Sequence, residues 1–574
     1  MTTKTIIATI VTISLYFTLG SCSAAQTKSD SPFEYREIYM LGTMGEQAKE
    51  KGLNSVDLDW GLWGHNIADI LPDKPAVNIY ARVGNRTFDK QYCFSSNHLF
   101  QYIEEYINDN FGDNDTIRFA IIPNDNDIVC LDDKCRHAGN TEDDASPAIY
   151  NLLRRLCERF PNHIFFTADY QSVKNLPTTP LPKNAGVLVS AINFPRTVSS
   201  TAEETEFLQR IADWKKMVDR VYVWDYICNF DDYFTPVPIF SIMQHRLQKY
   251  RDAGVKGVFL NGSGPDYSSF SRATSAILTD LLNNPDVDWK ATLKQYCDER
   301  YPVAGEHIYN FMVAQDDYFQ QKGQPLPMYD GVQKALEVYL PESQFVEFYN
   351  QLVSARDLAE GDEMERLNKI LNTLSMTMLE IKRINGDLTG YQDPLRRFTR
   401  LLDNDIDAYN ESYWSVSDYI SDYKFIVDHN AEVNGKNLLK GVKLKSLSPL
   451  DPDYNDISII TNGLLGIPSN YHSGNLIWSG SPSLNIEVPY TPGMSMVRIA
   501  FVDNAGYKIG LPSQVTASYE GQVFASVVPK RLKQHGGHSF VELNVPSHVA
   551  GPIVVKIYRD PDVKTIAVEE VEGL

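Results

Sequence analysis

The sequence predicts an α/β protein: a (β/α) barrel of the TIM type, followed by a helical domain and a C-terminal β-sandwich. Three patterns along the 574 residues indicate this. From 33 to 284, short apolar runs alternate with amphipathic helical periods, as in a parallel sheet with helical cover. From 285 to 435 only helical periods remain. From 436 to 574, short alternating segments separated by Gly, Pro, Asn and Ser are typical of a β-sandwich.

The barrel prediction rests on six apolar runs that read as buried parallel strands. A seventh strand is expected within DLDWGLWGHN (57–66), which allows an incomplete or irregular barrel. An open doubly wound sheet is the alternative, but no Gly-rich phosphate loop follows any strand. The six runs are YREIYML (35–41), TIRFAIIP (116–123), HIFFTADY (163–170), GVLVSAINF (186–194), RVYVWDY (220–226) and GVFLNG (257–262).

The helices are expected where apolar residues recur every three to four positions. Within the barrel they cover 98–109, 147–160, 203–217, 240–254 and 271–282, and in the helical domain 288–301, 344–359 and 363–385. In the sandwich, strand-like segments occupy 458–466, 483–490, 496–503, 514–521, 540–547 and 552–560. The sandwich either binds glycan or supports the barrel, and support is the favoured interpretation.

Composition indicates a folded protein that does not bind nucleic acid. Hydrophobic residues make up 43% of the chain and charged residues 22%, as in soluble globular proteins. The net charge of -21 repels phosphate backbones.

The N-terminus is typical of an exported lipoprotein. Residues 1–21 combine one Lys with an apolar run too short to span a bilayer comfortably. Leu19-Gly20-Ser21-Cys22 resembles a bacterial lipobox, in which Cys22 becomes the lipidated residue, and 22–32 form a tether. We expect an outer-membrane anchor, on the periplasmic or the cell-surface face. A plain secretory signal is the alternative.

Polar residues follow the predicted strands, at the rim where barrel enzymes place their functional groups. They include Asn124 to Asp127, Tyr170, Asn193, Asp225 and Asn261.

Several motifs together resemble glycoside hydrolase family 163, over about residues 33–310. They are FEYREI (33–38), LWGHN with ILP (62–72), PNDNDIVC (123–130), VYVWDYICNFDDYFTPVPIF (221–240), GVKGVFLNG (254–262) and NPDVDWKATLKQY (284–296). The resemblance implies a barrel enzyme that cuts N-acetylglucosamine linkages, in characterised members an endo-β-N-acetylglucosaminidase acting on complex N-glycans.

The chemistry needs a carboxyl group to protonate the leaving oxygen and a second group to stabilise the oxocarbenium-like centre. For an N-acetyl sugar, the substrate acetamide can act as nucleophile while an enzyme carboxylate orients it. Asp125 and Asp225 are the candidate catalytic pair, with Asp127 and Asp231 in reserve. The competing interpretation is that each acid only closes a turn.

The candidate substrate-binding residues are rings and short polar side chains near those acids. Trp63, Trp224 and Tyr226 would stack on sugar faces, with core packing as the alternative. His65 resembles a substrate-binding histidine of the family. The remaining candidates are Asn124, Asp127, Asn229, Asp231 and Asn261, and turn formation would also explain all of them except Asn124.

No metal or organic cofactor is expected. Cys130 and Cys135, with His137 nearby, are spaced more widely than a zinc knuckle, and no second pair follows. The family commonly has cysteines after this motif, which favours a local structural role or a disulfide.

One position departs from the family pattern. Relatives often carry a glutamate followed by a polar residue where this chain has Leu260 and Asn261. A glycan-binding lipoprotein without catalysis is therefore the alternative function. An exo-acting hydrolase of another sugar, such as a uronidase, would need a basic pocket around Arg196 or Arg82.

Overall fold

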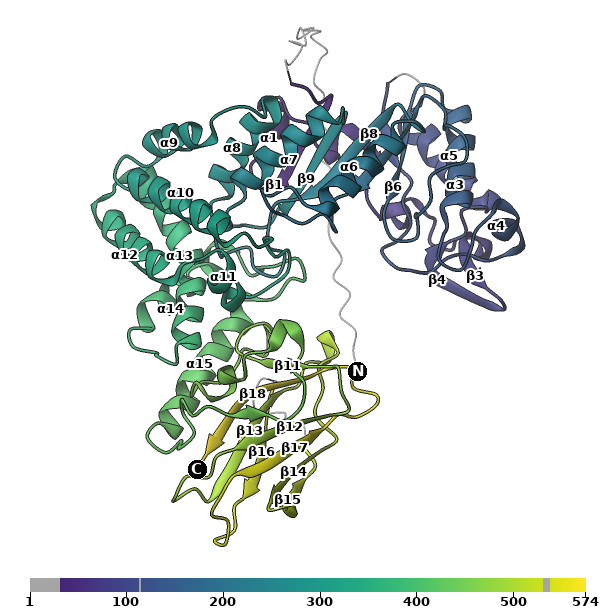
Figure 1. Ribbon diagram of the computed structural model, residues 1–574. Coiled ribbons are helices and arrows are strands. Elements are labelled where there is room, and N and C mark those ends of the chain that lie inside the picture. The colour runs from purple at the N-terminus through teal and green to yellow at the C-terminus, as the bar shows by residue number, and fades with distance from the viewer. Residues whose placement is uncertain (1–30, 113–114, 530–536) are drawn as a thin grey trace.

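A computed structural model of the chain describes residues 31–112, 115–529 and 537–574 (Figure 1). Cys22 and the predicted signal lie outside these residues. Seven parallel strands form one curled sheet in the order β1-β9-β8-β7-β6-β5-β2. They are β1 Tyr35–Met40, β2 Trp60–Leu62, β5 Arg118–Ala120, β6 Ile164–Asp169, β7 Ala185–Ser190, β8 Arg220–Tyr226 and β9 Gly257–Gly264. The six expected strands and the seventh, short one are all present.

The interior of the curled sheet is a single aromatic-rich cluster to which every strand contributes. Glycines on neighbouring strands make room for the rings: a Cβ on Gly186 would lie 2.3 Å from the Phe166 ring, and one on Gly257 would lie 2.6 Å from Tyr222. The cluster includes Tyr35, Trp60, Ala120, Phe166, Leu188, Tyr222 and Phe259.

The order of the strands is that of a TIM-type barrel, but the ladder is not closed. The two edge strands, β1 and β2, share no ladder in the described chain. Side chains and a loop bridge the seam instead: the Asn54 amide donates to the Arg36 carbonyl at 2.7 Å, and the Trp60 indole donates to the Tyr35 hydroxyl at 2.8 Å. The expected barrel is thus observed as a curled sheet with a side-chain seam.

Helices cover the outer face of the sheet, and a hairpin projects beside it. The larger covering helices are α3 Asn97–Asn110, α5 Ser146–Arg159, α6 Ala202–Trp214, α7 Phe240–Asp252 and α8 Ser271–Asn283. Shorter helices are α1 Glu46–Glu50 and α2 Val56–Asp59, and α4 Asp133–Ala138, which packs against α5. The hairpin joins β3 Tyr80–Val83 to β4 Arg86–Tyr92. Figure 1 shows it near α3, α4 and α5, away from the later helices.

The next seven helices begin beside α8, level with the sheet, and continue toward the C-terminal strands (Figure 1). A fully buried ion pair joins Arg383 to Glu380 at 2.8 Å, and the Tyr419 hydroxyl donates to the same carboxylate at 2.6 Å. The helices are α9 Trp289–Arg300, α10 Gly305–Lys322, α11 Val332–Val338, α12 Glu342–Leu358, α13 Gly361–Ile384, α14 Gln392–Thr399 and α15 Val416–Val433. Among the described residues, no helix is both long and apolar enough to cross a bilayer.

The C-terminal strands form two antiparallel sheets around a shared core. The segment 458–466 was expected to be strand-like, but this is wrong for its first part, since Ile457–Thr461 is a 3-10 helix. One sheet contains β10 Lys445–Ser446, β12 Ser483–Val488, β17 Ile553–Tyr558, β14 Gln514–Tyr519 and β15 Gln522–Val527. The other contains β11 Leu476–Trp478, β18 Ile566–Gly573, β13 Met496–Val502 and β16 His538–Asn544.

Candidate active site

Two tryptophans cap the aromatic interior at the carboxyl ends of the strands. Trp63 follows β2 and Trp224 lies on β8, and their rings stack with centroids 5.0 Å apart and planes 14° apart. Both rings also contact Phe259, at 4.6 and 4.7 Å. Both side chains are half-buried, and the Trp224 indole nitrogen has no hydrogen-bond partner among the described residues. The pair therefore forms an aromatic floor at the rim.

The register of the sheet places further rim residues on its inner face, the face on which Trp224 lies. Asn261 is the register partner of both Tyr39 and Tyr226, so these three side chains point inward together. Ser190, the partner of Trp224, places its hydroxyl 3.4 Å from that of Tyr226. Three of the predicted binding residues, Trp224, Tyr226 and Asn261, thus lie on the inner face.

Asp125 is exposed at this rim and is held by two neighbours. The Tyr170 hydroxyl donates to its carboxylate at 3.0 Å, and the Gln171 amide donates to the same oxygen. The His65 ring lies 6.3 Å from the Tyr170 ring, and its Nδ1 contacts the Pro123 carbonyl. Burial and the charge of Asp125 raise the pKa of Tyr170 to about 12, so Tyr170 stays a hydrogen-bond donor. Asp125 and His65 are thus both neighbours of Tyr170.

A second carboxylate reaches this region from the helical part of the chain. The loop 408–415 is closed by a bridge between Ala408 and Ser415, and the Glu411 amide donates to the Phe230 carbonyl at 3.0 Å. Glu411 is exposed on this loop. Partial desolvation raises its pKa, a hydrogen bond with Tyr329 opposes this, and the charges of Asp231 and Asp125 add to the increase. The charge of Asp125 thus contributes to the raised pKa of Glu411. No sequence motif marked it.

Asp231 lies beside this loop but is mostly buried. Its carboxylate is 2.9 Å from Nε2 of His472, which comes from the C-terminal part of the chain. The Tyr454 hydroxyl is 2.6 Å from the other ring nitrogen. Asp231 therefore joins the barrel to the C-terminal region, and it acts on Glu411 through charge.

The expectation that Asp225 acts as the second catalytic carboxylate is corrected by its position. Successive residues of a strand face opposite sides, so Asp225 points away from the rim and toward the helices. There it is fully buried, paired with Arg246, and accepts a hydrogen bond from the Tyr250 hydroxyl at 2.6 Å. Asp225 is enclosed by its own partners and cannot touch a substrate.

Two predicted binding asparagines have local structural contacts instead. The Asn124 amide donates to the Lys90 carbonyl at 3.0 Å. Asn229 is buried, with its amide donating to the Asp330 carbonyl at 2.8 Å and its side-chain oxygen accepting from the Asp231 amide at 3.1 Å. Turn closure, the alternative interpretation, fits Asn229, whereas Asn124 ties its loop to β4. Asp127 is exposed on the loop beyond Asp125.

The position that departs from the family pattern also faces outward. Leu260 pairs in register with Asp225 and Ile38, and it is fully buried between sheet and helices. The inward residue at this level is Asn261. The basic pocket required for a uronidase does not form at Arg196, because Arg196 is buried and donates to the backbone carbonyls of Leu326, Cys228 and Pro327.

Residues 31–313, just under half of the chain, match a family model described as "Domain of unknown function (DUF4838)". No match was found among curated proteins.

The solved structures that resemble the chain do so weakly. A family GH115 4-O-methyl-α-glucuronidase with specificity for decorated arabinogalactans is 12% identical with a TM-score of 0.37, covering 92% of this chain and 72% of that one. A GH138 enzyme targeting pectin rhamnogalacturonan II is 11% identical with a TM-score of 0.32, covering 83% and 77%. The lectin domain of lectinolysin, complexed with Lewis B antigen, is 15% identical with a TM-score of 0.19, covering 24% and 96%. Similarity at these TM-scores does not define an activity for this chain.

Proposed function

We propose that this protein is a glycoside hydrolase that cleaves β-linked N-acetylglucosamine within complex N-glycans or related host glycans. The enzyme is endo-acting, which means that it cleaves a linkage inside the glycan. The substrate acetamide is the nucleophile, and the configuration of the anomeric carbon is retained. The protein works as an exported lipoprotein held at the outer membrane through Cys22. The observation that carries the enzymatic proposal is the position of the Asp125 carboxylate, which Tyr170 and Gln171 hold at the rim. Trp63 and Trp224 form the floor of that rim.

The two carboxyl groups have environments suited to different roles. Glu411 has a raised pKa and is the proton donor to the leaving oxygen. Asp125, fixed by Tyr170 and Gln171, orients and polarises the acetamide. The stacked indoles offer an apolar face to the sugar ring, and the inward Asn261 offers an amide to its polar groups.

The test is incubation of the full chain, in detergent, with a glycoprotein bearing complex N-glycans. Released glycans are identified by mass spectrometry. The expected product lacks one N-acetylglucosamine, which stays on the protein. Asp125→Asn should lower the rate by at least about 100-fold, as expected when a group that stabilises developing charge is removed. Asp89→Asn, at an exposed acid on β4, is the matched control and should leave the rate unchanged.

A glycan-binding lipoprotein without catalysis is the second candidate. It is favoured by one observation: the inward residue of β9 at the rim is the amide Asn261 and not an acid. Glycan binding by the full chain that persists in Asp125→Asn, with no released product in either protein, would establish binding in place of hydrolysis.

A further inference from the structure

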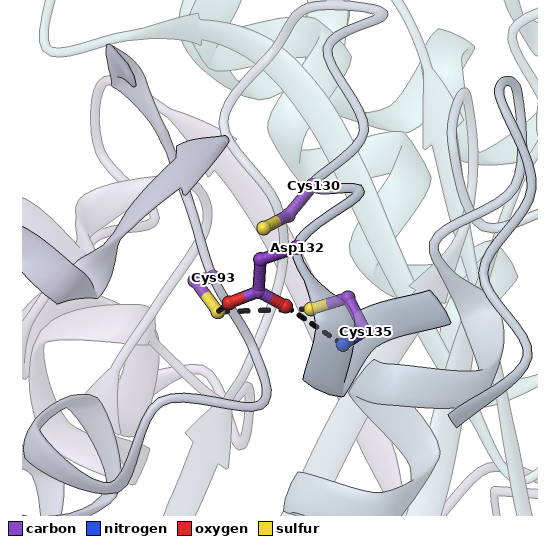
Figure 2. Close-up of side chains that lie close together, drawn as sticks. All are labelled: Cys93, Cys130, Asp132 and Cys135. Carbon is purple, nitrogen blue, oxygen red and sulfur yellow. Dashed lines mark hydrogen bonds between the residues drawn. The ribbon is translucent and has the colours of Figure 1, made fainter. Parts of the chain in front are cut away.

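Three cysteines and one aspartate converge at the base of the β3–β4 hairpin (Figure 2). Cys93 follows β4, Cys130 and Asp132 lie in the loop after β5, and Cys135 lies on α4. Their three sulfur atoms and one carboxylate oxygen all lie within 4.8 Å of one another. From the sequence, Cys130 and Cys135 predicted no metal, because their spacing is wider than that of a zinc knuckle and no second pair follows. Cys93, 42 positions before Cys135, supplies a third sulfur from outside that motif.

We propose that this cluster is a structural zinc site with Cys93, Cys130, Cys135 and Asp132 as its four ligands. Structural zinc is bound by four ligands in a tetrahedron, and thiolates favour zinc over the hard cations Mg²⁺ and Ca²⁺. Zn–S bonds of about 2.3 Å separate two sulfurs of a tetrahedron by about 3.8 Å. The Cys93 and Cys135 sulfurs are 3.6 Å apart, which leaves room for the ion between them.

The carboxylate of Asp132 is oriented for the same role. One oxygen accepts the Cys135 amide at 2.7 Å, capping the first turn of α4, and this fixes the side chain. The other oxygen is 3.2 Å from the Cys93 sulfur, close to the S···O edge of about 3.5 Å in a zinc tetrahedron. His137, on the same helix, is exposed and takes no part.

The surroundings of the sulfurs match those of metal-bound thiolates. Cys93, Cys130 and Cys135 are at most 2% exposed. The Arg82 amide donates to the Cys130 sulfur at 3.3 Å, and the Ser95 hydroxyl lies 3.3 Å from the Cys135 sulfur, where it can donate to a thiolate. Such outer hydrogen bonds orient metal ligands and support their charge. Binding of zinc releases the thiol protons to solvent.

A disulfide is the rival interpretation, and it accounts for less of the geometry. A bond between Cys93 and Cys135 would use two of the three sulfurs, leaving Cys130 as a thiol and Asp132 with no role beyond the helix cap. The zinc site uses all four groups. The described part of the chain has three further cysteines, Cys157, Cys228 and Cys297. They are buried and lie outside the cluster.

The site would fix the loop that carries Asp125. At one end of the loop, the side-chain amides of Asn124 and Asn126 donate to the Lys90 carbonyl of β4, at 3.0 and 2.9 Å. On the other, Cys130 would be joined through zinc to Cys93, which follows the same strand. The loop from Asn124 to Cys130 is thus held to β4 at both ends, so the metal has a positioning role and not a catalytic one.

The experiment measures zinc in the full chain, purified in detergent without chelator, by mass spectrometry of the metal. About one zinc per chain is expected, falling below about one tenth in Cys93→Ser and Cys135→Ser. Cys157→Ser and Cys297→Ser are matched controls, at buried cysteines on α5 and α9, and should retain the metal. Cobalt in place of zinc should give the intense visible bands of a tetrahedral site together with thiolate charge-transfer absorption.

Asp132→Asn keeps the test valid if the cysteine variants fail to fold. Asparagine can still cap α4, so the protein should fold but bind zinc at least about tenfold more weakly. Differential alkylation of the purified chain, read peptide by peptide, identifies the rival. A Cys93–Cys135 disulfide with no zinc bound, even after reduction and addition of Zn²⁺, would overturn the proposal.

Discussion

Asp225 and Arg246 form an ion pair in which neither side chain is exposed, on the face of β8 that packs against α7. Arg246 also donates to the Phe194 carbonyl at 2.5 Å and stacks over the Phe194 ring at 4.1 Å. The pair therefore ties a strand to its covering helix and to the loop after β7.

Asp225→Asn should destabilise the protein strongly. The substitution leaves the Arg246 charge buried without a counter-charge, which costs about 3–5 kcal/mol in the free energy of unfolding. Chemical denaturation followed by tryptophan fluorescence measures the loss.

A surface pair provides the control for this variant. Asp252 pairs with Arg251 at 2.9 Å with its side chain 64% exposed, so Asp252→Asn should change the free energy of unfolding by less than about 1 kcal/mol. If Asp225→Asn instead unfolded like the parent chain but lost all activity, Asp225 would be a catalytic group after all.

Glu411→Gln should lower the rate of glycan release by about 100-fold or more, since a general acid contributes about 10²–10⁴-fold. The pH dependence has a defined direction. Partial desolvation and neighbouring charges raise the pKa of Glu411 above its usual value, so the protonated, active form persists to higher pH than for an ordinary glutamate. The parent rate should fall as pH rises through that pKa.

The measurement is kcat/KM across pH for both proteins. The descending alkaline limb should disappear in Glu411→Gln, whose residual rate no longer depends on this proton. Retention of the limb in the variant would assign it to another group and remove Glu411 from the role of acid.

The order of strands and helices could be predicted from the sequence because each element carries its own periodicity. The direction of individual side chains on β8 could not. In a strand buried on both faces, apolar residues occupy both sides, so nothing local shows that Trp224 points inward and Asp225 outward. Only the packing of β8 against α7 settles it.

Groups from distant segments were missed for a different reason. Glu411 lies nearly two hundred positions beyond Asp231, in a loop between helices, and Cys93 lies in a segment whose hairpin was not foreseen. The hairpin had a local signal, the turn Gly84-Asn85 between β3 and β4, with Gly84 at a φ of 59°. Glu411 had none, because its approach to Asp125 is a property of the tertiary fold.

Trp63→Ala should weaken glycan binding, with KM rising about tenfold and kcat changing less. The reason is the loss of one face of the stacked pair, since aromatic contacts of this kind contribute about 0.5–1.5 kcal/mol beyond burial. Trp63→Phe retains a ring and should recover most of the affinity. Equal KM values for all three proteins would make the pair ordinary core packing.

The Glu37→Gln variant should have a higher free energy of unfolding than the parent chain, and this advantage should grow as pH rises. Glu37 is fully buried at the seam between β1 and β2, where it accepts the Val56 amide at 2.7 Å and contacts the Tyr35 hydroxyl. Burial raises its pKa from 4.5 to about 8. Between these two values the folded chain holds a proton that the unfolded chain has lost, so stability falls with increasing pH, by up to about 1.4 kcal/mol per pH unit.

Glutamine resembles the protonated acid and does not titrate, so the variant escapes this loss. Unfolding free energies of the two proteins at pH 5, 6.5 and 8 provide the measurement. The difference in favour of Glu37→Gln should widen steadily from pH 5 to pH 8, while Glu34→Gln, at an exposed acid on the same segment, should follow the parent. A constant difference across this range would mean that Glu37 is ionised in the folded protein and that the seam holds a charge.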